Sequence, residues 1–132
     1  MFSLLFLFLL SGATGSITAL ADVLFPSASF YEGLMEDFDR TSELLTRLRI
    51  LHPIVATGLS VALIIESRNI QKDYKIDVKF LQFLVIVAVT LGVLNVLSNI
   101  VLLLSIFHLA IADLLWITYI YVSMDKIKIN HQ

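Results

Sequence analysis

Apolar residues dominate four stretches of the chain, and polar residues gather between them. The first stretch, residues 1–21, carries no charged side chain. A membrane-spanning helix needs about 20 mostly apolar residues, so residues 2–24 are expected to form one span. A cleaved signal peptide is the alternative, because Ala19-Leu20-Ala21 fits a small-x-small cleavage site. The absence of a basic start and the length of the apolar run favour a retained helix.

A polar, acid-rich connection, residues 25–47, follows the first span. Pro26 and Ser27 are typical of a helix start. Beyond them, apolar side chains recur at helical spacing and define one face: Phe30, Tyr31, Leu34, Met35 and Phe38. The pattern predicts a short amphipathic helix along the membrane surface, with a solvated loop as the alternative.

The remaining three spans follow from where the charges fall. Residues 48–65 form the second span, which is short unless the arginine at its start reaches toward water, and residues 66–79 form a polar loop. From residue 80 to 124 the only charged residue is Asp113. One helix of that length would be about 65 to 70 Å long, twice the hydrocarbon thickness, so it must be two spans. The polar cluster at 95–99 divides it into spans 80–97 and 100–124.

Composition places this pattern in one class of protein. Hydrophobic residues make up 58% of the 132-residue chain, charged residues 15%, and the mean hydropathy is +0.91. These values exclude an average soluble domain. We expect an all-α integral membrane four-helix bundle, with residues 1–132 as a single membrane domain in the lipid bilayer. The net charge of −2 argues against nucleic acid as a partner, and the absence of cysteine excludes disulfides and thiolate ligands.

The basic residues predict how the bundle is oriented. Four spans place both termini and the 66–79 loop on one side of the membrane. That side holds six of the nine lysine and arginine residues: Arg68, Lys72, Lys75, Lys79, Lys126 and Lys128. The positive-inside rule therefore predicts a multi-pass protein of the cell membrane with both termini in the cytoplasm. The 25–47 connection then faces outward.

Two histidines, His52 and His108, lie within apolar stretches and in the outer half of the membrane under this topology. Ionisable groups inside a membrane are functional candidates by default. A catalytic zinc usually takes three protein ligands, and the third histidine, His131, is in the tail. Heme iron needs only axial ligands from two facing helices. Arg47 and Arg49 are placed to pair with heme propionates. A hydrogen bond between helices is the alternative role for either histidine.

Four segments resemble the heme A synthase family. Residues 91–97 (LGVLNVL), followed by 108–116 (HLAIADLLW), are similar to that family's paired helices. Residues 47–53 (RLRILHP) look like its other histidine-bearing helix, and 15–22 (GSITALAD) looks like its first helix running into an outer loop. Family members comprise two four-helix halves, and this chain resembles one half, as in compact archaeal forms.

The resemblance implies a membrane oxidoreductase that converts the C8 methyl of heme O to a formyl group, by successive hydroxylation and loss of water. His52 and His108 would be the axial heme iron ligands, with heme b as cofactor and heme O as substrate. A half-length chain implies a homodimer and an electron-transfer partner. Two alternatives stay open: a bis-histidine heme b-binding electron-transfer subunit without catalysis of its own, and a small scaffold whose histidines only hold helices together.

The catalytic group is unknown from sequence. Some family members carry a glutamate three residues before the first histidine, and Arg49 stands at that position here. Glu32 and Glu36 are weak catalytic candidates by location alone, with a solvated helix face as the alternative. Asp113, five residues after His108, is a candidate for orienting its surroundings or relaying a proton, with a buried packing residue as the alternative.

Overall fold

The computed structural model describes residues 2–70, 75–98 and 101–129, and the side chains of 3–69, 78–98 and 101–124. Across these residues the chain is helical and contains no strand. Two short helices, α2 (Phe30–Phe38) and α3 (Leu44–Leu48), accompany four long ones: α1 (Phe2–Leu24), α4 (Leu51–Ile70), α5 (Lys75–Leu97) and α6 (Leu102–Ile129). All four long helices belong to stretches long and apolar enough to cross a membrane, which confirms the all-α membrane bundle.

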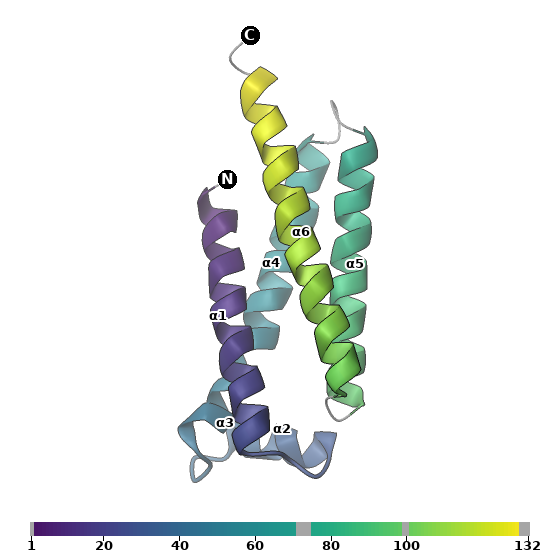
Figure 1. Cartoon of the computed structure of the whole chain (residues 1–132). Coiled ribbons are helices and arrows are strands. Elements are labelled where there is room, and N and C mark those ends of the chain that lie inside the picture. The colour runs from purple at the N-terminus through teal and green to yellow at the C-terminus, as the bar shows by residue number, and fades with distance from the viewer. Residues whose placement is uncertain (1, 71–74, 99–100, 130–132) are drawn as a thin grey trace.

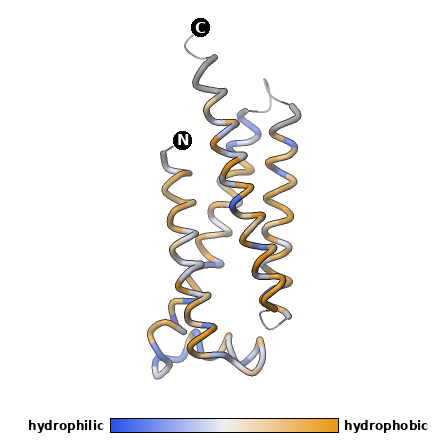
Figure 2. The backbone as a smooth tube through the Cα atoms, in the orientation of Figure 1, coloured by the Kyte–Doolittle hydropathy of each residue, from blue (hydrophilic) through white to orange (hydrophobic). Residues whose placement is uncertain are grey.

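The long helices form two neighbouring pairs. α1 packs against α4, α5 packs against α6, and the α4–α5 contact joins the pairs. Both chain termini lie at one end of the bundle, and α2 and α3 lie at the other (Figure 1). Hydrophobic positions dominate the four long helices, whereas polar ones gather in the connection that holds α2 and α3 (Figure 2). The pattern of apolar and polar residues therefore matches a bundle embedded along its length.

Helix ends extend beyond the expected spans at the end of the bundle that holds the termini. α4 runs to Ile70 rather than residue 65, α5 begins at Lys75 rather than residue 80, and α6 reaches Ile129 rather than residue 124. Backbone hydrogen bonds continue a helix into water without apolar side chains, so the end of the apolar run is not the end of the helix. Residues 71–74 of the expected loop and 99–100 of the expected break lie outside the described residues.

α2 forms where the sequence predicts a short amphipathic helix. The Ser29 hydroxyl accepts a hydrogen bond from the backbone N–H of Glu32, which caps the helix, and the Glu32 carboxylate accepts one from the Ala28 N–H. No residue of α2 is buried, and four large apolar side chains are exposed: Phe30, Tyr31, Met35 and Phe38. Such a helix suits the interface between water and lipid.

The buried core occupies only one half of the bundle, next to the termini. We call this the core half, and its cluster comprises Leu4, Phe8, Leu59, Leu63, Leu81, Leu84, Val85, Ala88, Leu115 and Tyr119. The Phe8 ring packs edge-on against Trp116 and at a tilt against Tyr119, with ring centroids 5.1 and 5.5 Å apart. The other half, which we call the histidine half, comprises residues 13–24 of α1, 51–58 of α4, 89–97 of α5 and 102–114 of α6. Among its described residues, Ala21 is the only buried hydrophobic one.

Candidate functional site

The structure brings His52 of α4 and His108 of α6 together in the histidine half. Their ring centroids are 6.4 Å apart and the ring planes are nearly perpendicular, at 82°. Both side chains are partly buried. They come from different helix pairs, because His52 belongs to the α1–α4 pair and His108 to the α5–α6 pair. The two imidazoles therefore face each other between the pairs.

Each imidazole lies against a glycine of the neighbouring helix. A Cβ added at Gly15 of α1 would lie 3.1 Å from Cε1 of His52, and one added at Gly92 of α5 would lie 3.1 Å from Cε1 of His108. Real Cβ atoms seldom approach another heavy atom that closely. The ring thus occupies the space that a side chain would take. The two helix pairs repeat one arrangement, with a glycine on the first helix and a histidine on the second.

Hydrogen bonds hold the Nδ1 atom of each imidazole. His108 Nδ1 lies 3.0 Å from the Ala88 carbonyl oxygen, which can only accept, so Nδ1 carries the proton. The Thr14 hydroxyl lies 2.9 Å from the Leu10 carbonyl oxygen and 3.4 Å from His52 Nδ1, so it can donate to the carbonyl and accept from the ring. A proton on Nδ1 leaves the Nε2 lone pair available. This is the arrangement in which a histidine binds a metal through Nε2 while its other nitrogen holds the ring in place.

The distance between the two rings matches that between two axial ligands of one heme iron. Two imidazoles on opposite faces of an iron have ring centroids about 6 Å apart, because each metal–nitrogen bond is about 2 Å and each ring centre lies about 1 Å beyond its nitrogen. The observed 6.4 Å agrees with that spacing. No group of three or more histidine or acidic residues that could hold a metal ion occurs in the described part of the chain. The ligand set suits heme, whose own nitrogens supply the other bonds.

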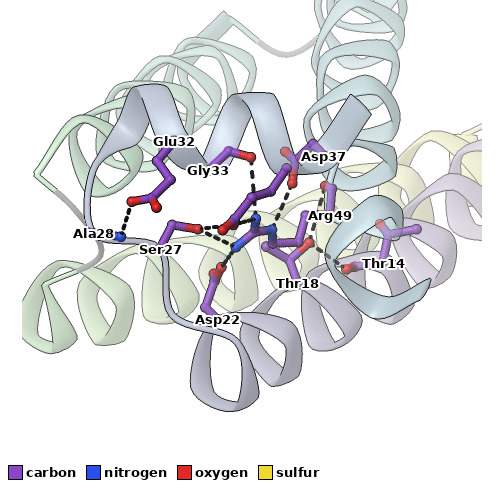
Figure 3. A network of polar contacts seen from close by, with 10 residues as sticks. Thr14, Thr18, Asp22, Ser27, Ala28, Glu32, Gly33, Asp37 and Arg49 are labelled. Carbon is purple, nitrogen blue, oxygen red and sulfur yellow. Dashed lines mark hydrogen bonds and ion pairs between the residues drawn. The ribbon is translucent and has the colours of Figure 1, made fainter. Parts of the chain in front are cut away.

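A second polar cluster surrounds Arg49, three residues before His52 (Figure 3). Nε of Arg49 donates to Asp37 at 2.8 Å, one terminal nitrogen donates to Asp22 at 3.1 Å, and the other donates to Glu36 at 3.2 Å. The remaining N–H groups donate to the Ser27 hydroxyl and the Gly33 carbonyl, both at 3.3 Å. Arg49 is buried. Its guanidinium therefore ties the end of α1 and the helix α2 to the start of α4.

The carboxylates of this cluster are held by Arg49 and by helix ends. The Ser27 hydroxyl donates to Glu36 at 2.6 Å. The Glu32 carboxylate accepts from the Ala28 N–H just before the N-terminus of α2. Burial raises the pKa of the Asp37 carboxyl, although the hydrogen bond and the charge of Arg49 act in the opposite direction. Both weak catalytic candidates, Glu32 and Glu36, therefore have partners within the connection between α1 and α4.

The expected propionate role does not fit Arg49 as the structure places it. All five of its N–H groups already have acceptors, so it has no free donor for a propionate. Arg47 is exposed beside it. Sequence reasoning did not identify Asp22 and Asp37 as partners of Arg49. The acid-rich composition of residues 22–43 was a signal that carboxylates are available, but it does not say which of them a folded connection turns inward.

Fold and site together define a class: a four-helix membrane protein with a pair of facing histidines between its helix pairs. The model of the COX15-CtaA family, described as cytochrome oxidase assembly protein, matches residues 1–120. The chain belongs to this family, which is the heme A synthase family. The resemblance seen in the sequence is thereby confirmed.

Two curated relatives match over a short part of their own length. Both are named protoheme IX farnesyltransferase, and they come from two strains of Thermus thermophilus. Each is 28% identical to this chain over 122 residues, which is 89% of this chain and 20% of the relative. The chain thus spans about a fifth of the length of the curated relatives it matches. No solved structure matches it significantly.

Proposed function

We propose that this chain binds heme between its two helix pairs, with His52 and His108 as axial ligands of the iron. The observation that carries the proposal is the 6.4 Å separation of the two imidazole rings. The hydrogen bonds at both Nδ1 atoms, which leave Nε2 free, support it as well. So does the near absence of a buried hydrophobic core in the described histidine half, because a macrocycle would supply apolar surface there.

We further propose the reaction of the family, oxidation of the C8 methyl of heme O to the formyl of heme A, with heme b as cofactor. Heme supplies a redox-active iron when bound. The chain's own residues hold and orient it: Thr14 and Ala88 fix the two rings, and the exposed Arg47 pairs with a propionate. The oxidation removes four electrons and four protons in total and adds one oxygen atom, which water can supply, so an electron-accepting partner is required. Protoheme IX in the relatives' name supports a heme substrate.

Glu32 and Glu36 remain the acidic groups proposed for the outer side of the site, and Arg49 acts by positioning the start of α4. The chain acts in this proposal as a homodimer in the cell membrane, with both termini in the cytoplasm. An alternative function is a bis-histidine heme b subunit that transfers electrons without its own catalysis. The histidine pair alone supports it equally.

Purified protein and two single variants, His52→Ala and His108→Ala, test the heme site. We expect the unaltered chain to show the absorption spectrum of a heme with two histidine ligands, and each variant to lose one axial ligand and most of its bound heme. Gln82→Ala, which removes a hydrogen bond to Ser67 in the core half, is the control that keeps the heme. Unaltered spectra in both histidine variants would contradict the proposed ligands.

Co-expression with an enzyme that makes heme O tests the reaction. Extracted hemes separated by chromatography should include hydroxylated heme O or heme A. Recovery of heme O and heme b alone, with an intact bis-histidine spectrum, would favour the electron-transfer subunit over the synthase.

A further inference from the structure

A carboxyl group is exposed on the outside of the bundle, halfway along a membrane-spanning helix. Asp113 lies at the middle of the apolar stretch Leu102–Met124 of α6 and is exposed. No hydrogen bond or ion pair to Asp113 is found among the described residues. The alternative role of Asp113 as a buried packing residue is therefore wrong. Ionisable side chains in membrane helices nearly always have a protein or water partner, because hydrocarbon solvates them poorly.

Asp113 also points away from the heme site proposed above. It follows His108 by five residues, and at about 100° per residue their side chains diverge by about 140° around the helix. Leu115 and Tyr119, on the inward face of α6, are buried in the core. Asp113 therefore belongs to a face that the rest of the chain does not cover.

That face is a continuous apolar stripe with one polar group at its centre. Residues at helical spacing on either side of Asp113 are strongly exposed: Leu102 76%, Ile106 55%, Leu109 63%, Ile117 62% and Met124 56%. Lipid alone would cover the apolar side chains of the stripe but would offer no hydrogen bond to the carboxyl group. A protein partner at the middle of the membrane can provide both.

We propose that this stripe of α6, centred on Asp113, is the contact between two copies of the chain. In a two-fold contact a residue on the axis meets its own copy. A carboxyl group is self-complementary there, because a protonated carboxyl both donates and accepts a hydrogen bond. Asp113 is the only charged residue from residue 80 to 124. A second copy is thus the partner that supplies a matching group at the same depth. The proposal rests on the homodimer of the proposed function and assigns its interface.

Single-cysteine cross-linking tests the contact, because the chain has no cysteine of its own. Leu109→Cys and Ile117→Cys place a thiol on the stripe one turn before and after Asp113. Phe83→Cys of α5 and Val61→Cys of α4 are matched controls, since both positions are 54% to 56% exposed on other helices. With a mild oxidant in native membranes, we expect disulfide-linked dimers from the stripe positions and little from the controls. Equal cross-linking at all four positions would overturn the proposal.

Substitution of Asp113 tests the carboxyl itself. We expect Asp113→Leu to raise the dissociation constant of the dimer in detergent about tenfold, measured by sedimentation, while Asp113→Asn keeps most of the association. Heme absorbance is recorded on the same samples. A dimer unchanged in Asp113→Leu would overturn this interface whatever the heme content. If the unaltered protein forms the dimer but binds no heme, the result would contradict the proposed heme site and not the proposed interface.

Discussion

Gly15 and Gly92 set how closely each imidazole approaches the neighbouring helix. An added Cβ at either position would lie 3.1 Å from the histidine Cε1. The ring would have to move away by a few tenths of an ångström. That movement lengthens the Nδ1 hydrogen bond that holds the ring, and it changes the distance between the two rings.

Gly15→Ala and Gly92→Ala should each weaken heme binding by about tenfold, because the groups that orient a metal ligand matter nearly as much as the ligand. Heme titration followed by absorbance measures the effect. Gly12→Ala and Gly58→Ala are matched controls on α1 and α4, since a Cβ there meets nothing within 4 Å. Equal effects in all four variants would show that helix propensity, rather than contact with the ring, is responsible.

The sequence identifies the two candidate histidines, but it does not predict their hydrogen-bond partners. His52 and His108 stand out because an ionisable group in an apolar stretch is rare, and topology alone places them on the same side of the membrane. Their hydrogen bonds to Thr14 and Ala88 depend on how α1 and α5 rotate against them. No spacing within one helix encodes that rotation.

Arg49 connects elements that are distant in sequence. It bonds to Asp22 at the end of α1 and to Glu36 and Asp37 in α2, and its carbonyl oxygen accepts from the N–H of His52 at 3.2 Å. The position of α2 is thereby coupled to the start of α4. A buried cation with three carboxylate partners is costly to break on one side only, because the remaining charges lose their partner.

Arg49→Gln should lower the free energy of unfolding by about 2 kcal/mol, since it leaves three partly buried carboxylates without their cation. Thermal unfolding in detergent, followed by circular dichroism, measures the loss. The stability of Arg49→Lys should lie between that of the unaltered protein and that of Arg49→Gln, because lysine keeps the charge but not the planar set of five donors. Arg40→Gln is the control, as Arg40 is exposed in the same connection. A loss in Arg40→Gln as large as that in Arg49→Gln would mean that net charge, not the cluster, is responsible.

The elements themselves follow from the apolar pattern, apart from their ends. α1 occupies residues 2–24 as expected and α5 ends at the expected Leu97, where the polar cluster interrupts the run. The C-terminal ends of α4 and α6 and the N-terminal end of α5 extend into polar residues. Helical hydrogen bonds do not depend on hydropathy, so the helices continue there. α3 was not expected. Its five residues carry too little periodicity to distinguish a short helix from a loop.

The whole molecule divides into a core half with a buried hydrophobic cluster and a histidine half that has almost no buried hydrophobic side chain among its described residues. α4 contains both: Leu59 and Leu63 are buried in the core, whereas Leu51 and Ile54 are exposed beside His52. Each helix pair contributes one histidine, so a ligand held by both would join the pairs where protein side chains do not. A ligand that binds only the folded state stabilises the region that it contacts.

Heme should therefore protect the histidine half from amide hydrogen exchange while leaving the core half unchanged. With free heme at about 100 times its dissociation constant, we expect exchange in residues 51–57 to slow by up to about 100-fold. Residues 59–65 of the same helix are the internal control, since their packing does not involve the histidines. His108→Ala should abolish the protection of residues 51–57, although the substitution is on another helix. Protection spread evenly along α4, or retained in His108→Ala, would contradict a ligand shared between the two pairs.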